Sequence, residues 1–182
     1  MHRVGDGGGR REARVTISPE RGGIRCWLIR HGKAVGARRD DLTRPLAKRG
    51  RADAASMRAW MLAQHPNDLP QLWVSSPARR TRETAELLAG GDVVLEPSLY
   101  GAWEGEFLAV MAATPLAIRS AAFVGHNPTL GSLFHSLSGR AGAPTPYPTL
   151  GTALFELPQG WEHPERARLL DFKSPKSVPL GD

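Results

Sequence analysis

The sequence predicts an α/β fold, a layered domain around a mostly parallel central sheet. Short apolar runs alternate with segments of helical spacing, the pattern of strands joined by helices. The chain has 182 residues, 41% hydrophobic and 23% charged, which is ordinary for one globular domain. No internal repeat or second domain is evident.

The first half of the predicted domain alternates two strands with two helices. The apolar runs suited to buried strands are residues 24–29 (I-R-C-W-L-I) and 72–75 (L-W-V-S). The segments with helical spacing are residues 47–63 and 80–89. The residues aligned on one face are Ala54, Met57 and Met61 in the first segment and Thr81, Ala85 and Leu88 in the second.

The second half continues the alternation and then ends in two consecutive strands. The predicted elements are a short strand at 92–95, a helix at 103–113, a strand at 121–124, a helix at 129–137, a Gly/Pro-rich loop at 139–148, and strands at 152–157 and 167–172. The helix at 129–137 carries apolar residues at i, i+3, i+4 and i+7: Leu130, Leu133, Phe134 and Leu137. Because no helix separates the last two strands, we expect an antiparallel edge.

The predicted domain spans residues 24–176. Residues 1–23 are rich in Gly and Arg without a hydrophobic period, which indicates a flexible basic extension. An early start codon and a basic arm of unknown use are the alternatives. Residues 177–182 are predicted to be a tail.

Charge and composition argue against several classes of protein. The net charge of +6 suggests nucleic acid as a possible partner, but the positive charges are dispersed along the chain, so we do not expect nucleic acid to bind. We also expect no membrane as partner. The chain has no apolar run long enough for a membrane span and no secretory h-region. Cys26 is the single cysteine, which excludes a disulfide framework; we expect it to fill core space. A cytoplasmic location is expected.

Unusual polar residues follow three of the predicted strands. The strand ends carry Arg30-His31-Gly32, Ser75-Ser76-Pro77 followed by Arg79, Arg80 and Arg82, and Gly125-His126-Asn127-Pro128. Since ligands of open α/β sheets bind beyond the carboxyl ends of parallel strands, we expect two histidines and at least two arginines to converge.

These residue types suit phosphoryl chemistry. Arginine offers a planar fork of donors to phosphate oxygens, a neutral imidazole can attack phosphorus, and a second, protonated imidazole can donate to the transferring group. Flanking positive charge favours the neutral form of His31, and Gly32 leaves room for close approach of the substrate. Taken singly, His31 also fits a core histidine, His126 a turn and Arg80 a solvated helix residue. Agreement of three strand ends favours the phosphate site.

Three motifs resemble those of the histidine phosphatase (phosphoglycerate mutase-like) superfamily. They are L-I-R-H-G-K-A, S-S-P-A-R-R-T-R-E-T-A-E and V-G-H-N-P. The resemblance implies a phosphoglycerate mutase-like fold, which is a three-layer α/β/α sandwich, and a metal-independent phosphatase without a cofactor. It implies His31 as the phosphate acceptor, with Arg30, Arg80 and His126 as the other catalytic residues. Arg80, four positions after Ser76, is implied rather than Arg79.

Further segments resemble the SixA-like phosphohistidine phosphatase branch. They are R-P-L-A-K-R-G-R-A-D-A, P-S-L-Y and F-K-S-P-K, and the similarity runs from about residue 25 to 176. This implies protein dephosphorylation, with a phosphohistidine-bearing phosphorelay protein as substrate and inorganic phosphate as product. The alternatives are a phosphatase of small phosphate esters and a non-catalytic phosphate-binding module.

The general acid is left open by the sequence. Many relatives have Glu after the L-Y segment, whereas here Gly101 follows Leu99-Tyr100. The candidates are Glu104, Glu106, Asp40 and Asp41, or none of them. A missing general acid favours a substrate with a P–N bond, because the histidine of a phosphohistidine can leave as neutral imidazole. The short segment between Thr84 and His126 leaves little chain for a lid, so we expect a shallow, open pocket suited to a protein substrate.

Overall fold

The computed structural model describes residues 23–37, 39–139 and 147–177. The predicted N-terminal extension, except Gly23, and the predicted tail, except Ser177, lie outside the described residues. Most of the predicted loop at 139–148 also lies outside them.

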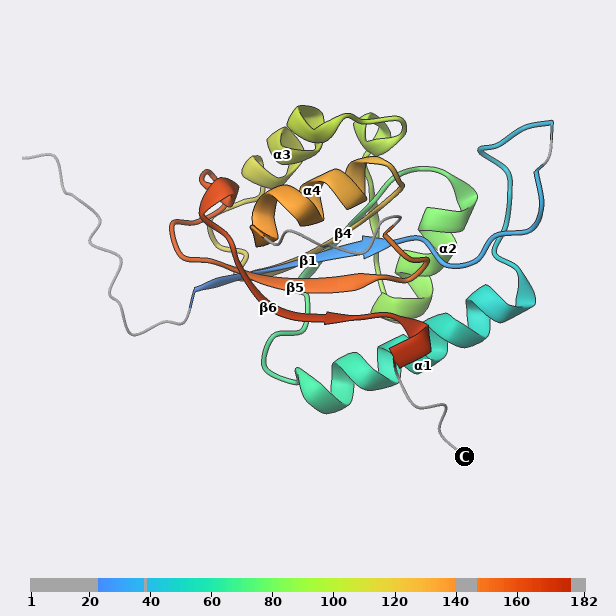
Figure 1. Ribbon diagram of the computed structural model, residues 1–182, viewed down its shortest axis with the longest axis horizontal. Coiled ribbons are helices and arrows are strands. Elements are labelled where there is room, and N and C mark those ends of the chain that lie inside the picture. Colours follow the sequence, from blue (N-terminus) through green and yellow to red (C-terminus); the bar gives the residue numbers. More distant parts are fainter. Residues whose placement is uncertain (1–22, 38, 140–146, 178–182) are drawn as a thin grey trace, which may run out of the picture.

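One six-stranded sheet forms the centre of the domain, in the order β3-β2-β4-β1-β5-β6 (Figure 1). The strands are β1 (Ile24–Arg30), β2 (Leu72–Ser75), β3 (Val94–Leu95), β4 (Ser120–Gly125), β5 (Thr152–Leu157) and β6 (Arg168–Lys173). β3, β2, β4 and β1 are parallel to their neighbours, whereas β5 runs antiparallel to β1 and β6 antiparallel to β5. The mostly parallel sheet and its antiparallel edge are both confirmed.

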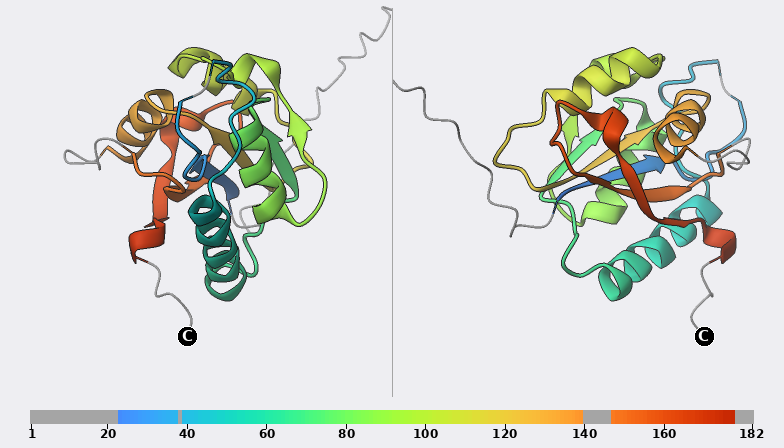
Figure 2. Two further views of the ribbon diagram at one scale, coloured as in Figure 1. Left: turned by 90° about the vertical axis from the view of Figure 1, so that its right-hand side faces the viewer. Right: turned by 60° about the vertical axis from the view of Figure 1, so that its left-hand side comes forward.

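Helices cover both faces of the sheet, which confirms the three-layer prediction (Figure 2). The helices are α1 (Lys48–Gln64) and α2 (Arg79–Ala89) on one face, and α3 (Glu104–Ala112) and α4 (Thr129–Ser138) on the other. Three single-turn 3₁₀ helices were not predicted: Pro97–Leu99, Pro164–Arg166 and Pro175–Ser177. Each begins with proline, whose fixed φ suits the first helical position, and each is too short to show a period. Among the described residues no helix is long and apolar enough to cross a membrane.

Two hydrophobic cores lie on the two faces of the sheet. Along β1 the side chains alternate: Trp27 and Ile29 pack towards α1 and α2, whereas Cys26 and Leu28 pack towards α3 and α4. The face residues predicted for the helices at 47–63, 80–89 and 129–137 are all buried. Cys26 is fully buried, as expected, and burial raises the pKa of its thiol.

The loop after β1 is fixed against the start of α1. Ala34 and Leu46 form a β-bridge across it, and the Ala47 N–H donates to the Lys33 carbonyl at 2.8 Å. Gly50, in the first turn of α1, lies directly on this backbone. A Cβ on Gly50 would stand 2.2 Å from the Lys33 oxygen.

Gly50→Ala is therefore expected to lower the free energy of unfolding by about 2–3 kcal/mol, because the backbone of the loop must shift to admit the methyl group. Gly36→Ala is the matched control in the same loop, since its Cβ would meet nothing within 4 Å. Urea unfolding of both variants measures the difference, and equal midpoints would contradict it.

Candidate active site

The three polar strand ends meet at one edge of the sheet, as the sequence predicts. β2, β4 and β1 are adjacent and parallel, and the left panel of Figure 2 faces the edge from which the loop after β1 emerges. The His31 N–H donates to the Gly125 carbonyl at 3.1 Å, and the Ser76 N–H donates to the Val124 carbonyl at 3.0 Å. The imidazole rings of His31 and His126 are 5.3 Å apart between centroids.

The contacts of His31 determine which ring nitrogen carries the proton. Its Nδ1 lies 2.8 Å from the Gly32 carbonyl oxygen, which only accepts hydrogen bonds. Nδ1 therefore carries the hydrogen, and Nε2 of the neutral ring has the free lone pair. Burial, followed by the charges of Arg80, Arg30 and Arg44, lowers the pKa of His31 to about 4 against the opposing effect of the Gly32 bond. Burial is thus a larger cause than the flanking charge that the sequence indicates.

His126 has the opposite tautomer. Its Nδ1 is 3.2 Å from Nη2 of Arg80, which has no lone pair, so Nδ1 accepts. Nε2 then carries the hydrogen and donates to the Ser76 hydroxyl oxygen at 2.9 Å. Burial, followed by repulsion from His31 in its protonated form and by the charge of Arg80, lowers the pKa of His126 to about 3. In this arrangement His126 is therefore a neutral donor at pH 7, and the protonated second imidazole expected for phosphoryl transfer stays a prediction.

Arg80 rather than Arg79 lies at the histidines. The Arg80 side chain is 8% exposed, and Nη1 and Nη2 donate to the Asp41 carbonyl oxygen at 2.7 Å and to Oδ2 of Asp41 at 2.8 Å. Arg79 instead pairs with Glu83 at 2.8 Å and is half exposed. Thr84 ties the helix to the end of β1, because its hydroxyl donates to the Arg80 carbonyl and accepts the Gly32 N–H.

Arg30 lies beside the histidines, and the backbone of Tyr147 holds its guanidinium group. Its Nη1 donates to the Tyr147 carbonyl at 2.5 Å, and Asn127 donates to the same oxygen at 2.9 Å. Three buried side-chain atoms among the described residues have no hydrogen-bond partner: Arg30 Nε, Arg44 Nε and Asn127 Oδ1. Two of them are N–H donors on arginines whose charge reaches His31, which suits an anionic ligand.

Sequence reasoning missed Arg44 and Tyr100 as members of this site. Nη1 of Arg44 donates to Oδ1 of Asp41 at 2.8 Å, and the Tyr100 hydroxyl donates to Oδ2 of Asp41 at 3.1 Å. The Tyr100 ring also contacts His126 edge-on, with centroids 5.7 Å apart. Both residues stand in segments that resemble the SixA-like branch, R-P-L-A and P-S-L-Y, so the resemblance contained the signal.

Only Asp41, among the four candidate general acids, is bonded to these residues in the described part of the chain. The hydrogen bond from Arg44, followed by those from Arg80 and Tyr100, lowers the pKa of Asp41 to about 2, so it is ionised at pH 7. Asp40 accepts the Leu42 N–H in a turn, and no hydrogen bond joins Glu104 to the histidines. In residues 23–37, 39–139 and 147–177 no group of three or more His, Cys, Asp or Glu side chains could hold a metal ion.

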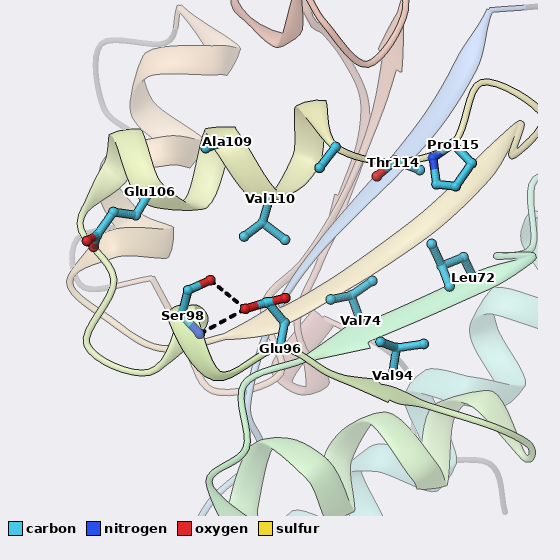
Figure 3. Close-up of a pocket in the computed structure, with 11 residues that line it drawn as sticks. Leu72, Val74, Val94, Glu96, Ser98, Glu106, Ala109, Val110, Thr114 and Pro115 are labelled. Carbon is cyan, nitrogen blue, oxygen red and sulfur yellow. Dashed lines mark hydrogen bonds between the residues drawn. The ribbon is translucent and has the colours of Figure 1, made fainter.

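Glu106 belongs to a different surface. Its carboxylate accepts the Trp103 N–H at 3.0 Å at the start of α3. It lines a largely apolar groove of about 450 Å³ between β2, β3 and α3 (Figure 3), where Glu96 accepts from Ser98. Neither histidine of the candidate site lines this groove.

The Cβ direction of Gly32 points into the packed loop. A Cβ at Gly32 would stand 3.2 Å from the Gly50 carbonyl oxygen and 3.2–3.3 Å from Leu46 and Leu150 side-chain carbons. These contacts are tight, so the packing of the loop on α1 favours glycine, and the expectation that Gly32 leaves room for the substrate stays a prediction.

The family assignment follows from a comparison with family models. The model of the histidine phosphatase superfamily (branch 1) matches residues 26–143. The chain belongs to the histidine phosphatase superfamily. The match includes all three strand ends of the candidate site.

Solved structures of histidine phosphatases have the same fold. A protein of Agrobacterium tumefaciens assigned as phosphohistidine phosphatase SixA is 30% identical, with 84% of this chain and 99% of that chain covered and a TM-score of 0.72. The protein histidine phosphatase SixA complexed with tungstate is 22% identical, with 86% and 100% covered and a TM-score of 0.73. The alpha-ribazole phosphatase from Shigella flexneri is 18% identical, with 87% and 100% covered and a TM-score of 0.62. The last two likenesses show the fold alone.

No curated protein sequence matches the chain. The superfamily and the fold together identify the protein as a phosphatase, and they confirm the phosphoglycerate mutase-like fold.

Proposed function

We propose that this phosphatase hydrolyses phosphohistidine on a phosphorelay protein, without a metal ion, through a phosphorylated intermediate on His31. The observation that supports it most is the neutral, partly buried His31, whose Nε2 lone pair is free while Nδ1–H is held by the Gly32 carbonyl. A neutral imidazole among arginines is suited to attack an anionic phosphoryl group.

The proposed reaction has two displacements. Arg30 and Arg80 bind and polarise the phosphoryl oxygens, and Arg44 adds a third guanidinium. His126 binds a phosphoryl oxygen through Nε2–H, which must exchange its Ser76 partner for that oxygen. The Nε2 lone pair of His31 forms a bond to phosphorus as the bond to the substrate's nitrogen breaks, and the substrate imidazole leaves with that electron pair. Water then attacks phosphorus, the P–N bond to His31 breaks, and dihydrogen phosphate and neutral His31 are released.

The acid–base state of the site favours a P–N bond in the substrate. An alkoxide leaving group needs a proton from a well-positioned general acid. The histidine side chain of a phosphohistidine leaves as neutral imidazole if its other ring nitrogen is already protonated, so it needs no such acid. Asp41, the carboxyl group bonded at the site, is ionised at pH 7 and bound to two arginines. Phosphohistidine is also the substrate named for the 30% identical relative. The exposure of Asp41 and Tyr100, 44% and 39%, suits a substrate presented on a protein surface.

The test is single-turnover hydrolysis of a phosphorylated histidine-containing phosphotransfer protein beside a panel of small phosphate esters, all with EDTA present. We expect faster turnover of the phosphoprotein. Preference for one small ester would replace the proposal with a small-molecule phosphatase. Phosphate binding without turnover of either would point to a binding module.

The neutrality of His31 gives a prediction on pH. Because burial lowers its pKa to about 4, the imidazole is expected to stay neutral from pH 7 down to about pH 4 and to gain its proton only below that. NMR titration of the histidine ring C–H signals, assigned with His31→Ala, measures this. A midpoint for His31 near the ordinary value of 6.5 would contradict it.

A further inference from the structure

The Asp41 carboxylate lies between two guanidinium groups of the active site. Oδ1 accepts from Nη1 of Arg44 at 2.8 Å, and Oδ2 accepts from Nη2 of Arg80 at 2.8 Å. The Tyr100 hydroxyl donates to the same Oδ2 at 3.1 Å. A carboxylate between two guanidinium groups occupies the position that phosphoryl oxygens require. Carboxylate and phosphoryl oxygens both accept hydrogen bonds from the N–H groups of the same arginines.

Asp41 also accepts hydrogen bonds from both terminal nitrogens of Arg80. Both terminal nitrogens of Arg80 bond to Asp41, one to its carbonyl and one to its carboxylate, and Nη2 also donates to Nδ1 of His126. A phosphoryl group therefore has to share or displace the carboxylate contact. The exposure of Asp41 allows this, since its side chain can turn to water while its carbonyl oxygen stays on Nη1 of Arg80.

We propose that Asp41 is a positioning residue that holds Arg80 and Arg44 by its carboxylate and competes with inorganic phosphate for them, so that the product is released readily. This rests on the proposed function, in which Arg80 is a phosphate ligand. The negative charge of Asp41 repels a bound phosphate dianion as well as competing for its donors. The low pKa of Asp41 keeps that charge in place throughout the neutral range.

Asp41→Asn tests the proposal, because it keeps the shape and one acceptor but removes the charge. We expect the dissociation constant of inorganic phosphate, measured by calorimetry, to fall about tenfold, as for one unit charge removed a few ångströms from a phosphate in a half-exposed site. The inhibition constant of phosphate and KM should fall together, and kcat should fall because release slows. Simple damage to the site would raise KM instead.

Asp40→Asn is the matched control, since it removes the same charge from the neighbouring residue, whose carboxylate bonds only to the Leu42 N–H among the described residues. Its phosphate affinity should stay within about twofold, well below the effect expected for a charge at contact distance. Unchanged or weaker phosphate binding in Asp41→Asn, or an equal effect of Asp40→Asn, would overturn the proposal.

Arg80→Met separates this inference from the proposed function. Loss of phosphate affinity in Arg80→Met with no gain in Asp41→Asn would overturn only the role of Asp41. Unchanged affinity in Arg80→Met would overturn Arg80 as a phosphate ligand, and with it the role of Asp41.

Discussion

His31→Ala is expected to reduce turnover at least roughly 10⁴-fold, as for removal of other enzymic nucleophiles. The Nε2 lone pair of His31 is the nucleophile in the proposed reaction, and the other groups of the site only bind and polarise the phosphoryl group. The fold should persist, because the imidazole makes one hydrogen bond, to the Gly32 carbonyl, and the backbone bond from His31 to Gly125 remains. Steady-state kinetics and thermal unfolding measure the two effects.

His135→Ala is the matched control for that experiment, since His135 is exposed in the last turn of α4. If the effect is specific to His31, the His135→Ala variant keeps the wild-type rate. Label from a ³²P-phosphoprotein should be trapped on the wild-type protein and on His135→Ala but not on His31→Ala. Near-normal activity of His31→Ala would refute the nucleophile assignment.

The strand ends were predictable from the sequence because the sheet is built from local patterns. The apolar runs around Cys26, Trp73 and Phe123 mark buried strands, and the parallel order of β2, β4 and β1 brings their carboxyl ends together. Once those strands are parallel, His31, Arg80 and His126 must lie near one another. The chemistry could be inferred from three short motifs for this reason.

The contacts that Asp41 makes with Arg80 and Tyr100 were not predictable, because they join residues far apart in the chain. Tyr100 reaches Asp41 across 59 positions and Arg80 reaches it across 39, and Asp41 and Tyr100 stand in loops without a regular period. The pKa values of the histidines depend first on burial, which is a property of the whole fold. The sequence therefore predicted that His31, Arg80 and His126 meet, whereas the protonation state of each imidazole depends on the folded structure.

Arg80 should be the residue whose loss costs most after the nucleophile. Arg80→Met is expected to lower kcat/KM about 10³-fold, because it removes a buried cation with several directed donors from the phosphoryl group. Arg80→Lys should recover little of this, since an ammonium group cannot present a planar fork to Asp41, His126 and a phosphate oxygen together. Steady-state kinetics of both variants measure the loss.

Arg79→Lys is the matched control, because Arg79 is adjacent in sequence but pairs with Glu83 away from the histidines, and it should change kcat/KM within about twofold. The Arg80 variants also have a second readout. The charge of Arg80 lowers the pKa of both His31 and His126, so Arg80→Met should raise both values, whereas Arg80→Lys, which keeps the charge, should raise them less. Unchanged kcat/KM in Arg80→Met would refute Arg80 as a phosphate ligand, and unchanged histidine pKa values would refute the placement of its charge beside the imidazoles.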